Sequence, residues 1–111
     1  MKKNKYNVEL SQRAERMLLQ HTEFLARVSL PAARKLISST KDVEAKLSEN
    51  PELYPYADEV DVPGIPLKTY RKCIFDKRYK AIFLIEGNDV FVDAIIDCRQ
   101  ENKNLFYSGE Q

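Results

Sequence analysis

The chain has 111 residues, of which 43% are hydrophobic, and its formal net charge is +1. Two domains are excluded, because each would be too short to bury a stable core of its own. The net charge by itself indicates no particular class of partner, so the distribution of charge along the chain is more informative. We expect a single domain over residues 1–111, with a polar tail that begins at about residue 100.

The first half of the chain predicts one strand followed by two helices. Apolar residues alternate in "YNVEL" at residues 6–10, which is the period of a half-buried strand. Ser11 can cap the helix predicted over residues 12–28, and Pro31 suits the first turn of a second helix that ends before Pro51. The short link between the helices predicts an antiparallel hairpin. The residues expected on its buried faces are Ala14, Met17, Leu18, Leu25, Val28, Ala33, Leu36, Ile37, Thr40, Val43 and Leu47.

The second half predicts a long loop and then three strands. Residues 51–66 contain four of the five prolines and show no period, and a loop of this length in a small domain is often functional. Strands are expected over residues 68–75, 79–86 and 90–96, separated by "DK" and by "GN", a good two-residue hairpin turn. This order predicts an α+β fold, in which a two-helix hairpin covers one face of an antiparallel sheet. The opposite face is expected to be open.

Several classes of protein are excluded by what the sequence lacks. Cys73 and Cys98 have neither the spacing of a metal knuckle nor the density of a disulfide scaffold, so we expect free thiols. One histidine and three glycines provide no recognisable metal site and no phosphate-binding loop, so no cofactor is expected. No apolar stretch is long enough for a signal peptide or a membrane span. We expect a soluble, cytoplasmic protein.

Charge is strongly segregated in the middle of the chain. Residues 41–62 contain seven acidic and two basic residues, whereas residues 68–80 contain six basic residues and one acidic residue. Such a division indicates a face for an anion or an acidic partner. The basic residues are Lys68, Arg71, Lys72, Lys77, Arg78 and Lys80.

The order of elements and several local motifs resemble the RelE/ParE superfamily of bacterial toxins, whose members are often described as plasmid stabilisation proteins. The resemblance covers nearly the whole chain: "YNVELSQRAERML", the "SENPELYPY" loop, the "LKTYRKCIFDKRYKAIFLIEGNDVFV" meander and the closing "IIDCRQ". It implies the toxin of a type II toxin–antitoxin system, which is neutralised by a cognate antitoxin. Some members cleave mRNA on the ribosome and others inhibit DNA gyrase, so the fold alone does not choose between these activities.

The ribonuclease members imply a set of site residues. Such cleavage needs cations that hold the phosphate as charge builds, and a group that moves the proton of the ribose hydroxyl. The resemblance points to Arg71 and Arg99 as catalytic residues, with Lys68, Lys72, Lys77 and Arg78 as substrate contacts. The same bases can also form a solvated edge or a surface that an acidic antitoxin segment covers.

The sequence departs from the ribonuclease pattern at Cys98, near the place where many of those members have a histidine. A half-buried cysteine usually only packs, and His21 lies at helical spacing from apolar residues, as a packed histidine does. Tyr107, in a tail expected to pack only through Leu105 and Phe106, matches the family's C-terminal tyrosine poorly.

Two further acids are candidates for a base. Glu86 lies next to the hairpin turn, and Asp93 is expected on the open face together with Phe91 and Ile95. Three functions therefore stay open: a ribonuclease toxin, a gyrase-binding toxin without catalysis, and a non-toxic interaction module.

Overall fold

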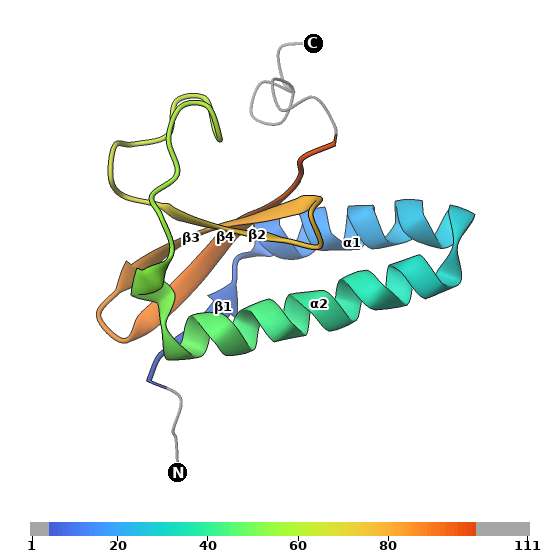
Figure 1. Ribbon diagram of the computed structural model, residues 1–111, viewed down its shortest axis with the longest axis horizontal. Helices are drawn as coiled ribbons and strands as arrows, with labels where there is room; N and C mark the ends of the chain where they lie inside the picture. The colour runs from blue at the N-terminus through green and yellow to red at the C-terminus, as the bar shows by residue number, and fades with distance from the viewer. Residues whose placement is uncertain (1–4, 100–111) are drawn as a thin grey trace.

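The structure is a computed structural model, and it describes residues 5–99. A hairpin of two helices lies against one face of a four-stranded sheet (Figure 1). The elements in chain order are β1 (Asn7–Leu10), α1 (Gln12–Val28), α2 (Leu30–Glu49), the short 3₁₀ helix η1 (Pro51–Leu53), β2 (Arg71–Phe75), β3 (Tyr79–Glu86) and β4 (Asp89–Asp97).

The strands are ordered β1-β4-β3-β2 across the sheet. β2, β3 and β4 form the expected antiparallel meander, and β1 adds to β4 in parallel, with Val8 opposite Val90. The predicted α+β fold is confirmed, and the parallel pair makes the sheet mixed. β4 lies between β1 and β3, so it joins the first strand of the chain to the rest of the meander.

Ser29 is the single residue between the two helices. Its backbone is extended, its N–H donates to the carbonyl of Leu25 at 2.7 Å, and its hydroxyl accepts a hydrogen bond from the N–H of Ala32 at 3.2 Å. One serine therefore ends α1 and caps α2. The sharp reversal that results makes the helices antiparallel neighbours, as the short link predicts.

The main core lies between the helices and the sheet. Leu36 and Leu47 of α2 pack in the same cluster as Phe83 of β3 and Val90 of β4, and each is at most 1% exposed. Two residues expected on the buried helix faces are exposed instead, and Met17 packs against a different cluster. Val28 is 76% exposed because it lies at the end of α1, where the hairpin extends beyond the sheet, and Ile37 is 43% exposed (Figure 1).

A β-bulge interrupts the alternation of β4. Ile82 pairs with Ala94 and Phe83 pairs with Val92, so Asp93 has no opposite residue of its own. The extra residue shifts the side chains after it, and Ile95 consequently faces the helices, where it is 1% exposed. The expectation that Asp93 and Ile95 share the open face is wrong for Ile95.

The face opposite the helices is partly covered by the long loop. Ala57 and Val62 of the loop form a second buried cluster with Ile82 of β3 and with Ala94 and Ile96 of β4. The expectation of an open face is therefore wrong for this part of the sheet. The loop's apolar residues have no period, which is why the sequence does not indicate which of them are buried.

Candidate functional site

Lys72 and Lys80 lie on the loop-covered face of the sheet and share one carboxylate. Their ammonium groups donate to Asp61 at 2.9–3.0 Å, and Asp61 and Lys80 are 5% and 7% exposed. Burial alone would raise the pKa of Asp61, but the hydrogen bonds from Lys72 and Lys80 lower it to about 2. These charges hold the loop on the sheet.

Arg78 is paired inside the fold as well. Its Nε and Nη2 donate to the two carboxylate oxygens of Asp97 at 3.2 and 2.9 Å, and Asp97 is 1% exposed. The backbone N–H of Arg99 donates to the same carboxylate at 3.0 Å. Burial opposes ionisation of Asp97, but these hydrogen bonds lower its pKa below the ordinary value. The pair fixes the chain at the end of β4.

Arg71, a predicted catalytic residue, is held by η1 and the residues that follow it. Its Nη1 donates to the carbonyls of Tyr54 at 2.7 Å and Glu52 at 3.3 Å, and its Nη2 donates to the Tyr56 hydroxyl at 3.2 Å. The guanidinium also lies 4.3 Å from the centre of the Tyr56 ring. In this position Arg71 fastens the start of the loop to β2.

The two predicted catalytic arginines are at different ends of the sheet. Arg71 lies opposite Phe83, whereas Arg99 follows Asp97, which lies opposite Tyr79. The four steps along the strand from Tyr79 to Phe83 span roughly 13 Å, and Arg99 lies beyond that span. The fold therefore does not bring Arg71 and Arg99 to one phosphate-sized position.

Lys68 and Lys77 differ from the other bases of this region. Both are exposed, and neither forms an ion pair with another residue of the described range 5–99. Both also have positive φ, 52° for Lys68 and 55° for Lys77, a backbone conformation that residues other than glycine rarely adopt. They lie at opposite ends of β2.

A cavity of about 360 Å³, called here the basic cavity, lies between the helical hairpin and the turn that joins β2 to β3. It brings together Lys77, Arg78 and Arg99 from the predicted site, whereas Lys68, Arg71 and Lys72 lie elsewhere. Tyr79 also lines it, a residue that the sequence did not single out because it resembles ordinary core. The remaining lining residues are Leu25, Ala32, Lys35, Leu36 and Asp76.

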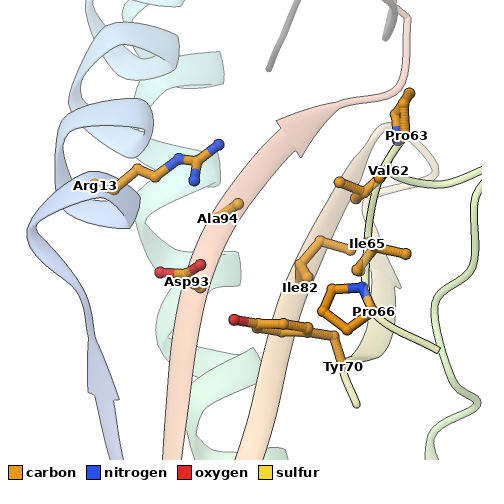
Figure 2. A pocket seen from close by; sticks show the side chains of 10 residues that line it. Arg13, Val62, Pro63, Ile65, Pro66, Tyr70, Ile82, Asp93 and Ala94 are labelled. Atoms are coloured by element: carbon orange, nitrogen blue, oxygen red, sulfur yellow. The ribbon is translucent and has the colours of Figure 1, made fainter. Parts of the chain in front are cut away.

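A second cavity of about 170 Å³, called here the outer pocket, lies between the loop and the opposite face of the sheet. Figure 2 shows Arg13 and Asp93 on one side and apolar loop residues such as Ile65 on the other, with the ring of Tyr70 below. Its volume is below that of typical small-molecule sites, so it suits one inserted side chain better than a whole ligand. The bulge that places Asp93 here was not predictable from alternation.

The remaining candidates have structural surroundings. The Nε2 of His21 lies 2.8 Å from the carbonyl oxygen of Ile95, as a packed histidine would. Cys98 is exposed, and desolvation raises the pKa of its thiol, so its position does not favour a thiolate. Glu86 is exposed at the end of β3. Leu105, Phe106 and Tyr107 lie outside the described residues.

Within residues 5–99 the structure contains no helix long and apolar enough to cross a membrane. In the same part of the chain, no three His, Cys, Asp or Glu side chains are grouped so that they could hold a metal ion.

Comparison with known proteins agrees with the fold. A solved structure, "Chromosomal ParDE TA system from P. aeruginosa", superposes with a TM-score of 0.65 at 11% identity, over 86% of this chain and 98% of that one. A comparison with curated sequences gives no significant match. The family model described as "ParE toxin of type II toxin-antitoxin system, parDE" matches residues 8–102. The resemblance to the RelE/ParE superfamily is thereby confirmed, and the chain belongs to the ParE toxin family of type II toxin–antitoxin systems.

Proposed function

We propose that this chain is a growth-inhibiting toxin that is neutralised by a cognate antitoxin, and that it acts by binding DNA gyrase rather than by cleaving mRNA. The observation that carries this proposal is the match of the ParE toxin family over residues 8–102. Gyrase works in the cytoplasm, so the proposal places the chain there.

The state of the basic residues supports binding over cleavage. Cleavage of RNA needs free cations around one phosphate and a nearby group that transfers a proton. Here Lys72, Lys80 and Arg78 are paired with buried carboxylates, and Arg71 is bound to backbone carbonyls. A phosphate clamp would have to break these contacts first.

The ribonuclease remains the second candidate, and one observation favours it. Arg99 and Lys77 line the same cavity, and their side chains form no ion pair within the described part of the chain. In that candidate function Arg71 and Arg99 are the catalytic residues, and Lys68, Lys72, Lys77 and Arg78 contact the mRNA on the ribosome.

One induction experiment separates the candidates. The chain is expressed without its antitoxin, and growth, transcript 5′ ends and the supercoiling activity of gyrase are measured. We expect growth arrest, inhibited supercoiling and intact transcripts. Cuts at defined codons that disappear in Arg99→Ala would instead establish the ribonuclease.

The antitoxin is sought as a small open reading frame adjacent to the gene, and its product is co-expressed with the chain. We expect its product to bind the chain and to restore growth. If induction of the chain alone does not slow growth, the proposal of a toxin is wrong and the non-toxic module is the correct alternative.

A further inference from the structure

We propose that the basic cavity is the docking site for an acidic side chain of the antitoxin, carried on an apolar segment that also covers the tip of the helical hairpin. This inference rests on the proposed function and adds to it the chemistry of the contact. Three features of the cavity carry it: its charge, one buried hydroxyl and its apolar surroundings.

The charge around the cavity is positive. Lys35, Lys77, Arg78 and Arg99 line it together with Asp76, and Asp97 lies behind Arg78, so among the described residues the bases exceed the acids by two. Lys35 is bound to Asp76 at 3.3 Å and Arg78 is bound to Asp97, whereas Lys77 and Arg99 form no ion pair with any residue of the range 5–99. A carboxylate that enters between these two side chains would balance the excess charge.

The second feature is the hydroxyl of Tyr79. Tyr79 lines the cavity and is 2% exposed, and its hydroxyl has no hydrogen-bond partner within residues 5–99. Buried polar atoms without partners are rare in folded proteins, because the lost hydration is not replaced. The oxygen is shielded from solvent, and a carboxylate that reached it from the cavity would accept a hydrogen bond from it and would remove the cost.

The third feature argues for a polypeptide rather than a bare anion. Leu25, Ala32 and Leu36 form an apolar wall of the cavity. Beyond that wall, Val28 and Leu30 at the tip of the hairpin are 76% and 55% exposed. A free anion would leave this surface uncovered, whereas apolar residues on either side of an acidic one would bury it.

The test compares two lysines that share their exposure, their backbone conformation and the lack of an ion pair within the described residues. Lys77 lines the basic cavity, whereas Lys68 does not. The affinity of the antitoxin is measured by calorimetry for the unaltered chain, Lys77→Glu and Lys68→Glu. We expect Lys77→Glu to weaken binding at least tenfold and Lys68→Glu less than threefold, since a like charge at the contact is repulsive.

Tyr79→Phe provides a second measurement, with effects of opposite sign. Removing an unpaired hydroxyl should raise the melting temperature of the free chain. The same change should weaken the antitoxin complex by roughly tenfold, because a hydrogen bond to a carboxylate is lost. A hydroxyl with only a structural role would not weaken the complex.

The possible failures can be told apart. If the adjacent gene product binds the unaltered chain and all three variants equally, the docking inference is wrong and the proposed function stands. If that product does not bind the unaltered chain, both are wrong. If the free chain is a dimer in sedimentation and Lys77→Glu dissociates it, a second copy occupies the cavity and the inference is overturned.

Discussion

Asp61 illustrates how a single carboxylate can determine the position of a whole loop. Both of its oxygens accept hydrogen bonds from Lys72, one also accepts from Lys80, and the other accepts from the backbone N–H of Asp58. Each of these groups would be costly to bury alone, so the cluster is stable only when it is complete. If Asp61 is lost, the ammonium groups of Lys72 and Lys80 are left next to the sheet without a carboxylate to balance them.

Asp61→Asn should therefore destabilise the chain by about 3 kcal/mol, because an amide cannot balance the two lysines. Urea denaturation followed by circular dichroism measures the change. Glu59→Gln, which removes an exposed acid of the same loop, is the control and should change stability by less than about 0.5 kcal/mol. Equal effects of the two substitutions would mean that the pairing contributes no specific stability.

The same cluster predicts how stability depends on pH. The pKa of Asp61 is lowered from 3.8 to about 2 in the folded chain, so its contribution is complete above about pH 5 and is lost as the pH falls towards 2. A shift of this size corresponds to about 2 kcal/mol. Urea midpoints between pH 3 and 7 should fall less steeply with acid in Asp61→Asn than in the unaltered chain. The pH dependence that remains in the variant reports other carboxylates whose pKa is lowered in the folded chain, such as Asp97.

At the scale of elements, the helical hairpin depends on its one-residue link. Ser29 accepts the hydrogen bond that starts α2 and donates the one that ends α1. The hydroxyl matters only for the first of these, because the second uses the backbone N–H. A longer link would satisfy the same groups but would not constrain the angle between the helices so closely.

Ser29→Ala should lower the free energy of unfolding by about 1 kcal/mol, because the cap of α2 loses its acceptor. Ser38→Ala makes the same chemical change at an exposed position within α2 and should be neutral or slightly stabilising, since alanine is the better helix former. Both are measured by urea denaturation. A loss of stability in Ser38→Ala as large as that in Ser29→Ala would contradict the capping role.

The elements themselves were largely predictable, because their periods and caps are local. The exceptions have physical reasons: the strand expected from residue 68 begins at Arg71, since the positive φ of Lys68 is incompatible with a strand. The parallel partner of β1, the bulge at Asp93 and the ion pairs of Asp61 depend on residues far apart in sequence. Charge clustering consequently identified the basic residues but not which of them the fold uses internally.

At the scale of the whole molecule, the reactivities of the two cysteines show whether the folded domain has opened. Cys98 is exposed after the end of β4, whereas Cys73 of β2 is 5% exposed in the core between the sheet and the helices. Burial raises the pKa of the Cys73 thiol, which lowers its reactivity further. Labelling of Cys73 therefore requires that the domain open.

In a Cys98→Ser variant, a thiol reagent should modify Cys73 roughly a thousandfold more slowly under native conditions than in urea, since opening the core costs about 4 kcal/mol or more. In Cys73→Ser, the thiol of Cys98 should react at similar rates in both conditions. The reagent is an aromatic disulfide, and both reactions are followed by the absorbance of the aromatic thiolate that it releases. Fast native labelling of Cys73 would show that β2 opens independently of the rest.

The position of β4 has a consequence for how the protein folds while it is being synthesised on the ribosome. Of the strands that the structure describes, β1 is made first, and β4, with which it pairs, is made last. At about 5–20 residues per second, translation separates the two strands by on the order of ten seconds. During that time neither the sheet nor the face on which the helices pack is complete. A nascent chain that stops before β4 therefore cannot assemble the domain, and the toxin fold appears only when almost all of it has been synthesised.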